Sequence, residues 1–168
     1  MRKISTLFAV IGMILISSCE GPQGPPGFDG QDGLIAEVFE VTTSFNSANN
    51  FSKVVVLTPT IYASDVVLVY RLVNVFQGQD VWKLLPDTHY FNDGTRDFSY
   101  DFDFTISDVN IYMVGNNLET VADQFRLNQV LRIVIVPGSF SAAINKNSYT
   151  DVMAALNMKE SQVQNINF

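Results

Sequence analysis

The chain has 168 residues, a formal net charge of −7 and a single cysteine. The acidic balance argues against a nucleic-acid partner, because that kind of binding depends on basic side chains that neutralise phosphates. A single cysteine excludes an intramolecular disulfide, and together with the single histidine it cannot supply the several ligands of a zinc site. The 13 Phe and 6 Tyr residues, with frequent Val and Ile, predict a domain built mainly of β-strands.

Residues 1–18 have the pattern of a secretory signal peptide. Arg2 and Lys3 precede the apolar stretch Ile4–Ile16, and small residues follow it. This stretch is well short of the roughly 20 apolar residues that a membrane span requires, and Glu20 blocks its extension. We therefore expect residues 1–18 to be cleaved during export.

The end of this segment, Ile16-Ser17-Ser18-Cys19, resembles the lipobox of bacterial lipoproteins. In that family the cysteine thiol is thioether-linked to diacylglycerol, the signal is cut just before the cysteine, and the new amino group is usually acylated. The resemblance implies that Cys19 is a lipidation site and that the lipid bilayer is a partner of the chain. Two or more acyl chains hold a protein stably at a membrane, so no transmembrane helix is needed.

A run of glycines with a strict period of three follows the cysteine. Together with Pro22, Pro25 and Pro26 it has the Gly-X-Y pattern of collagen, and the glycines are Gly21, Gly24, Gly27, Gly30 and Gly33. One interpretation is an extended linker, which would reach on the order of 40 Å at about 3.1 Å per residue. The other is a nucleus for trimerisation, although the run is short for a triple helix.

The combination Cys19-Glu20-Gly21-Pro22-Gln23-Gly24-Pro25 resembles a group of lipoproteins common in Bacteroidota, with a lipobox cysteine, a collagen-like stretch and a small β domain. The resemblance implies a cell-envelope lipoprotein anchored in the outer membrane. It leaves open whether the domain faces the periplasm or the cell surface.

Residues 34–168 are expected to form one domain, an antiparallel β-sandwich with one short C-terminal helix. The spacing of Tyr149, Val152, Met153 and Leu156 predicts the helix near 149–157, capped by Thr150 or Asp151. Strands are expected at 34–45, 53–57, 66–76, 81–85, 98–106, 109–113 and 130–136, with an edge strand at 163–168.

The clearest alternation lies between residues 98 and 106, after the turn signal Asn92–Thr95. It predicts that one face of the strand points inward, comprising Phe98, Tyr100, Phe102, Phe104 and Ile106. The other face, with Ser99, Asp101, Asp103 and Thr105, is expected to be solvated. Asp101 and Asp103 share that face and are the candidate calcium ligands, although acidic residues on a polar strand face are usually just solvated.

Other candidate site residues are few. Trp82, Tyr62, Tyr90 and Phe91 are candidate ligand-binding aromatics if they are exposed, but most aromatics of such a chain belong to the core. His89 lies between two expected strands without a catalytic motif, so we expect a surface or loop residue. The sequence assigns no catalytic residue and no cofactor.

The function expected from the sequence is that of a non-enzymatic cell-envelope lipoprotein that displays a β-sandwich binding or structural module on a short stalk. Its ligand would be a glycan or a protein. The alternatives are a carbohydrate-active or calcium-dependent binding module and a trimeric C1q-like head on a collagen-like stalk. A monomer is favoured over a homotrimer, because the Gly-X-Y run is too short to hold three chains by itself.

Overall fold

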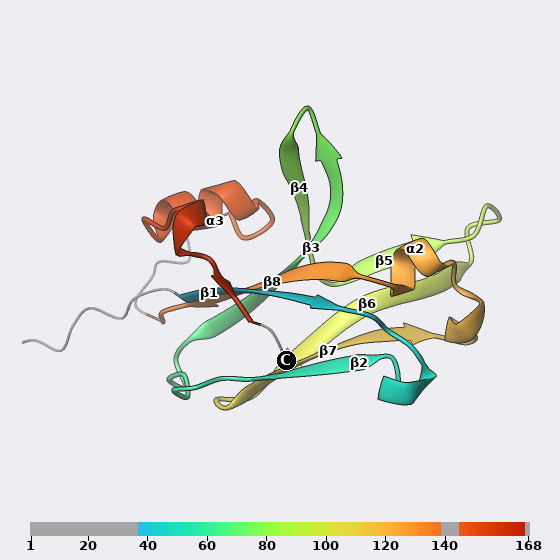
Figure 1. Ribbon diagram of the computed structural model, residues 1–168, viewed down its shortest axis with the longest axis horizontal. Helices are drawn as coiled ribbons and strands as arrows, with labels where there is room; N and C mark the ends of the chain where they lie inside the picture. Colours follow the sequence, from blue (N-terminus) through green and yellow to red (C-terminus); the bar gives the residue numbers. More distant parts are fainter. Residues whose placement is uncertain (1–36, 139–144, 167–168) are drawn as a thin grey trace, which may run out of the picture. The chain divides into compact units, whose positions relative to one another are not determined.

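The computed structural model describes residues 37–138 and 145–166 (Figure 1). The predicted signal peptide, Cys19 and the Gly-X-Y segment lie outside the described residues, so the expectations about them stay predictions. None of the helices in the described part of the chain has the length and hydropathy needed to cross a membrane.

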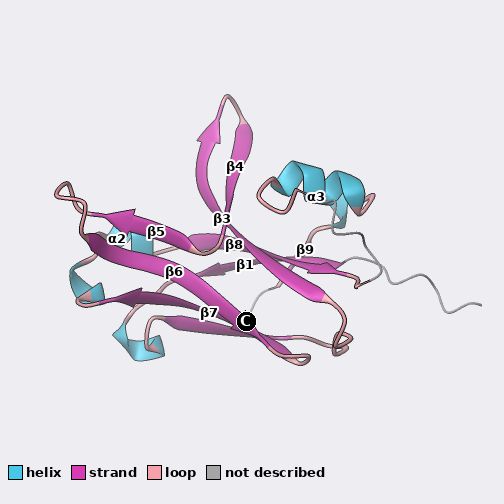
Figure 2. Cartoon of the chain, turned by 180° about the vertical axis from the view of Figure 1, so that it is seen from behind, coloured by secondary structure: helices cyan, strands magenta, loops and turns pink. Residues whose placement is uncertain are grey.

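The described residues form a β-sandwich, which confirms the fold class predicted from the sequence (Figures 1 and 2). The five-stranded sheet has the order β4-β3-β8-β1-β9, and the four-stranded sheet has the order β2-β7-β6-β5. Neighbouring strands are antiparallel except β1 and β9, which pair in parallel. The strands are β1 (Glu37–Thr43), β2 (Ser52–Val56), β3 (Val66–Phe76), β4 (Gln79–Leu84), β5 (Asp87–Tyr90), β6 (Arg96–Phe104), β7 (Asp108–Gly115), β8 (Gln129–Val136) and β9 (Gln164–Asn165).

Short helical segments connect or cover the strands. The α-helices are α2 (Asp123–Arg126) and α3 (Tyr149–Ala155), and the 3-10 turns are η1 (Ser47–Asn49), η2 (Leu118–Thr120) and η3 (Glu160–Gln162). The predicted C-terminal helix is therefore present as α3. Its cap is Ser148, whose hydroxyl accepts a hydrogen bond from the Asp151 N–H at 3.2 Å, so the predicted caps Thr150 and Asp151 are wrong.

The main core lies between the two sheets. Val69 and Ile133 of the five-stranded sheet and Tyr100 and Ile111 of the four-stranded sheet all belong to it and are fully buried. Burying such a side chain contributes about 1.5–3 kcal/mol.

A second core lies on the outer face of the five-stranded sheet, under α3. Tyr149, Val152 and Met153 of the helix pack there against Tyr70 of β3 and Val134 of β8. The sheet is thus covered on both faces, which explains why β3 and β8 read as nearly continuous apolar runs rather than as alternating ones.

Strand β6 leaves the core before it ends. Phe98 and Tyr100 are buried and Phe102 is half-buried, but Phe104 is 41% exposed and Ile106 is 53% exposed. The prediction that Phe104 and Ile106 point into the core is therefore wrong. Strand β6 ends at Phe104, and Ile106 lies in the turn to β7. Period-two alternation marks a face of the strand, but it does not tell where the opposite sheet stops covering that face.

Two further sequence expectations need correction on the four-stranded sheet. His89 lies within strand β5, opposite Phe98 of β6, and its side chain is only 25% exposed, so the expected surface or loop position is wrong. Ser99, expected to be solvated, is buried between its cross-strand neighbours Thr88 and Val114.

The hairpin of β3 and β4 projects beyond the body of both sheets (Figures 1 and 2). Gln77 and Gly78 join the strands with positive φ angles of 51° and 77°, which a two-residue hairpin turn requires and which glycine adopts without strain. The strand pairing shifts between Leu72 and Asn74, at a bulge. Beyond this bulge the hairpin exposes apolar side chains, among them Val75 and Phe76.

Candidate functional site

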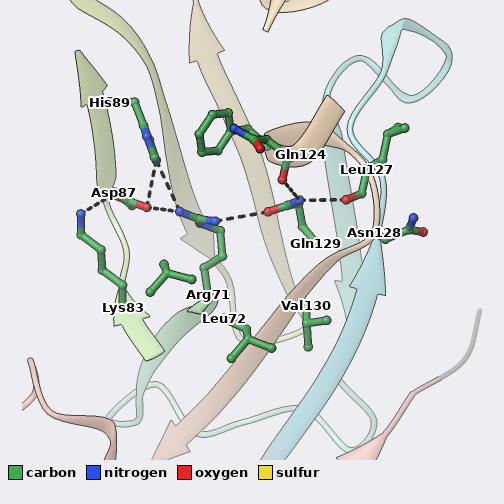
Figure 3. Close-up of a pocket in the computed structure, with 12 residues that line it drawn as sticks. Arg71, Leu72, Lys83, Asp87, His89, Gln124, Leu127, Asn128, Gln129 and Val130 are labelled. Carbon is green, nitrogen blue, oxygen red and sulfur yellow. Dashed lines mark hydrogen bonds and ion pairs between the residues drawn. The ribbon is translucent and has the colours of Figure 1, made fainter. Parts of the chain in front are cut away.

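A cleft of about 620 Å³ opens beside the base of the β3–β4 hairpin, between β5 and the segment that contains α2 (Figure 3). Its polar side is formed by charged and amide side chains from strands of both sheets. They are Arg71 of β3, Lys83 of β4, Asp87 and His89 of β5, and Gln129 of β8. Apolar side chains such as Leu72 and Val130 complete the lining.

A buried ion pair lies at the centre of this cleft. The Arg71 Nη2 donates to Asp87 Oδ2 at 2.6 Å, and the two side chains are 7% and 1% exposed. Arg71 Nη1 also donates to Gln129 Oε1 at 3.3 Å. Because Arg71 and Gln129 come from the five-stranded sheet and Asp87 comes from the four-stranded sheet, the pair links the two layers of the sandwich.

Two more side chains contact the same carboxylate. Lys83 Nζ lies 2.5 Å from Asp87 Oδ1, although the lysine side chain is 54% exposed. His89 Nε2 lies 3.2 Å from Asp87 Oδ2, and the tautomer that carries its proton on Nε2 donates to the carboxylate. The imidazole stacks on Phe98, with ring centroids 4.4 Å apart and planes inclined by 10°. His89 is therefore held between a carboxylate and an aromatic ring.

These partners control the ionisation of Asp87. Burial raises the pKa of its carboxyl, but the hydrogen bonds from Arg71 and Lys83 and the nearby positive charges outweigh burial and hold the pKa below its usual value. Asp87 is consequently ionised at neutral pH. A carboxylate bound in this way is a weak general base, because taking up a proton would disrupt its ion pairs.

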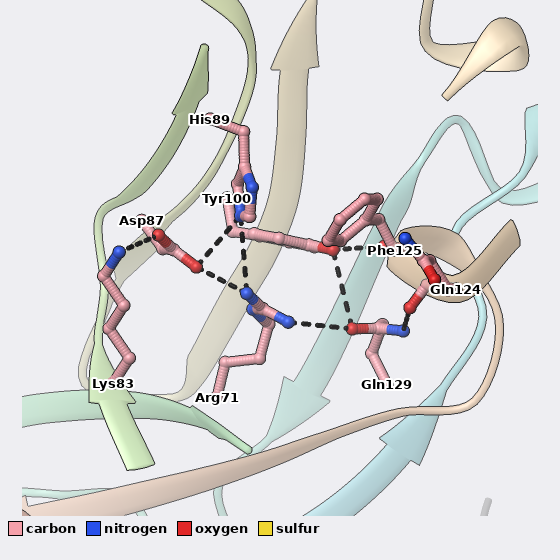
Figure 4. A network of polar contacts seen from close by, with 8 residues as sticks. All are labelled: Arg71, Lys83, Asp87, His89, Tyr100, Gln124, Phe125 and Gln129. Atoms are coloured by element: carbon pink, nitrogen blue, oxygen red, sulfur yellow. Dashed lines mark hydrogen bonds and ion pairs between the residues drawn. The ribbon is translucent and has the colours of Figure 1, made fainter. Parts of the chain in front are cut away.

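Tyr100 of β6 extends the network toward α2 (Figure 4). The Arg71 guanidinium lies 4.5 Å from the centre of the Tyr100 ring, and the Tyr100 hydroxyl donates to the backbone carbonyl of Phe125. Burial raises the pKa of Tyr100 to about 12, so the phenol keeps the proton that it donates. The Gln129 Nε2 donates to the carbonyl oxygens of Gln124 and Leu127 at 2.9 and 2.8 Å.

Among the described residues, two buried atoms of the network lack a hydrogen-bond partner, Arg71 Nε and Asp87 Oδ1, and Asp87 Oδ1 has the ion pair with Lys83 instead. The other polar groups at the centre are bonded to one another, so they fix the position of β3, β5, β6 and β8 relative to each other. Among the polar side chains that line this cleft, Lys83, Gln124 and Asn128 are exposed and accessible to a ligand.

The candidate aromatics from the sequence are not brought to one place. Tyr90 and Phe91 are 64% and 54% exposed at the connection from β5 to β6. Tyr62 is 55% exposed, next to Ile61, whose N–H bonds the Ile106 carbonyl in the β6–β7 turn at the other end of β6. Trp82 is half-buried on the five-stranded sheet, in a second groove beside α3.

The candidate calcium ligands Asp101 and Asp103 lie on β6, on the side opposite the main core. Asp101 is half-buried and accepts a hydrogen bond from the Phe102 N–H at 2.9 Å, and Asp103 is exposed. Within the part of the chain that the structure describes, no three His, Cys, Asp or Glu side chains come together in a way that would hold a metal ion.

Sequence reasoning missed the Arg71–Asp87 network. A weak signal for it exists, because Arg71 is a charged residue inside the apolar run 66–76 and a cation in that position needs a partner. Comparisons of the chain with protein-family models, with curated proteins and with solved structures found no significant match.

Proposed function

We propose that the chain is a non-enzymatic lipoprotein of the bacterial outer membrane, in which acylated Cys19 holds the β-sandwich to the bilayer. The observation that carries this proposal is the order of motifs in residues 1–33: a signal peptide, a lipobox and then the Gly-X-Y segment. Residues 21–33 act as the spacer between the bilayer and the domain.

In this proposal the sandwich is a binding or structural module. The geometry of the first cleft supports that interpretation, because Asp87, the one carboxylate among its described lining residues, is bonded to Arg71, Lys83 and His89. A carboxylate with three cationic or basic partners stabilises the fold at the junction of the sheets, whereas a catalytic acid or base has to exchange its proton during a reaction.

Metabolic labelling with palmitate in the producing bacterium tests the anchor. The wild-type chain should incorporate label and partition with membranes, and Cys19→Ala should incorporate none and keep its signal peptide. Ser17→Ala is the matched control, because it leaves a small residue in the lipobox and should still be labelled. Label in the Cys19→Ala chain, or a wild-type chain that is soluble without detergent, would show that the proposal is wrong.

A further inference from the structure

A second groove, of about 650 Å³, lies between the β3–β4 hairpin and α3. On the hairpin side it is lined by Gly78, Gln79, Asp80 and Trp82, which belong to the turn and to β4. On the other side it is lined by residues of α3 and of the segment that follows, including Met153, Met158 and Glu160. Because the hairpin residues that line the groove come from the turn and β4, the groove runs along β4. We call it the β4 groove.

Strand β4 brings a free backbone edge to this groove. It is the outermost strand of the five-stranded sheet on its side, and among the described strands it pairs with β3 alone. Gln79 lies opposite Phe76 at the end of the two-residue turn, where the two residues form a hydrogen-bonded pair. Further along, the Leu85 N–H donates to the Val69 carbonyl at 2.9 Å. Because hydrogen-bonded positions alternate along an antiparallel strand, the backbone groups of the odd-numbered residues of β4 bond β3. The N–H and C=O groups of Asp80 and Trp82 therefore point to the outer edge, where a further strand would find them.

The floor of the β4 groove is apolar, and the Trp82 ring in it is held in place. The Trp82 ring is packed against the Arg132 guanidinium, which lies 4.1 Å from the ring centre. Arg132 is in turn bonded to Glu40 at 2.8 Å and to Glu160 at 2.6 Å, so the indole has little freedom to move. Met153 and Met158 supply flexible thioether side chains, which adapt to apolar groups of different shapes.

The rim of the β4 groove is acidic. Asp80 and Glu160 both line it, and none of the described lining residues is Lys or Arg. The Glu160 side chain is 64% exposed even though it is paired with Arg132, so it remains accessible to a second cation. The whole chain carries a net charge of −7, which adds to the attraction for a basic partner.

We infer that the β4 groove binds an extended, basic segment of a partner polypeptide, which pairs its backbone with β4 and places an apolar side chain against Trp82. Residues two positions to either side of that apolar residue point to the same face of an extended strand, and there Lys or Arg would meet Asp80 and Glu160. The inference rests on the proposed function in one respect, that the sandwich is a binding module. A polypeptide fits better than a saccharide, because only a polypeptide uses the free strand edge.

The intrinsic fluorescence of Trp82 reports on binding directly, because it is the single tryptophan of the chain. The full chain, purified in detergent from the producing cells, is titrated with a capped peptide whose core is Lys-Thr-Leu-Thr-Lys. A saturable change in fluorescence is expected. The same peptide N-methylated at all five core residues cannot donate to the strand edge in either strand direction and should produce no saturable change. A Glu-Thr-Leu-Thr-Glu peptide should not bind.

Charge variants separate the β4 groove from the rest of the acidic surface. Asp80→Asn should weaken binding of the basic peptide by roughly two- to fivefold, the range of an exposed ion pair. Asp101→Asn removes a carboxylate from the four-stranded sheet instead, and should leave the affinity unchanged. Equal effects of the two substitutions would mean that only the net charge of the chain attracts the peptide, which would overturn the inference.

Three further results would overturn the inference. Equal binding of the N-methylated peptide would show that the strand edge is not used. Saturable binding of cellohexaose in place of the peptide would identify a saccharide groove. Absence of any fluorescence change with the basic peptide would show that the β4 groove does not take this partner. If palmitate still labels Cys19 in the same preparation, only this inference fails, whereas loss of labelling alone contradicts the proposed anchor.

Discussion

At the scale of single residues, the buried pair of Arg71 and Asp87 dominates the junction of the two sheets. Asp87→Ala leaves the Arg71 guanidinium buried without its counter-ion, so we expect a loss of about 3–5 kcal/mol in the free energy of unfolding. Urea denaturation followed by circular dichroism measures this loss. Lys83→Met removes the exposed partner of the same carboxylate and should cost at most about 1 kcal/mol.

A double variant shows whether the pair itself or the uncompensated charge determines that loss. Arg71→Met with Asp87→Leu replaces both charges by apolar side chains, so it should recover most of the stability lost in Asp87→Ala. If Asp87→Ala costs no more than Lys83→Met, the ion pair does not hold the sheets together and the structural role assigned to it is wrong.

The lowered pKa of Asp87 predicts a specific dependence of stability on pH. Because the carboxyl has a lower pKa in the folded than in the unfolded chain, its contribution is fully present above the unfolded value of about 3.9. It is lost as the pH falls through the folded-state pKa. The stability difference between wild type and Asp87→Asn should therefore shrink as the pH falls below about 4. Urea titrations at several pH values measure it, and a difference that does not change down to about pH 2 would contradict the assignment.

At the scale of elements, β6 allows an internal comparison of stability losses, because the exposure of its phenylalanine side chains increases along the strand. Phe98 is 2% exposed, so Phe98→Ala should cost about 3–5 kcal/mol. Phe104 is 41% exposed, and Phe104→Ala should cost about 1 kcal/mol or less. The half-buried Phe102 should fall between them. Thermal denaturation of the three variants measures this order, and equal losses would show that the far end of β6 is covered in solution.

The elements that could be predicted from the sequence are those with strong local patterns. Strand β3 was predicted at its observed bounds, since an apolar run of that length between turn residues is typical of a buried strand. Strand β5 was not predicted, because Asp87-Thr88-His89-Tyr90 has no apolar periodicity, and its pairing with β6 makes it a strand. The strand conformation of residues 87–90 therefore depends on tertiary pairing, which no local sequence pattern encodes.

The candidate site was beyond sequence reasoning for a related reason. Arg71, Asp87, Tyr100 and Gln129 come from four strands, and they meet only because of the register between strands and the packing of the two sheets. The sequence shows a charged residue inside an apolar run, but it does not show which distant residue is its partner. The aromatic candidates do not meet for the same reason, since Tyr62, Trp82 and the pair Tyr90-Phe91 lie in separate parts of the fold.

At the scale of the whole molecule, the two cores of the domain bear on how many chains assemble. The described domain has cores of its own on both faces of the five-stranded sheet, and we predict a monomer. Analytical ultracentrifugation of the purified chain at micromolar concentration, corrected for bound detergent, measures the mass of the particle. A protein mass three times that of one mature chain would contradict the monomer and give the Gly-X-Y segment a structural role.

The second core also affects how the chain reaches its folded state. A polypeptide leaves the ribosome or an export channel from its N-terminus onward. Strands β1, β3, β4 and β8 have all emerged once Val136 is out, but the apolar residues of α3 begin only at Tyr149. During that interval the outer face of the five-stranded sheet, with Leu68, Tyr70 and Val134, is uncovered and prone to aggregation. Docking of α3 ends this vulnerable stage, which makes the nascent chain a natural client for a holding chaperone.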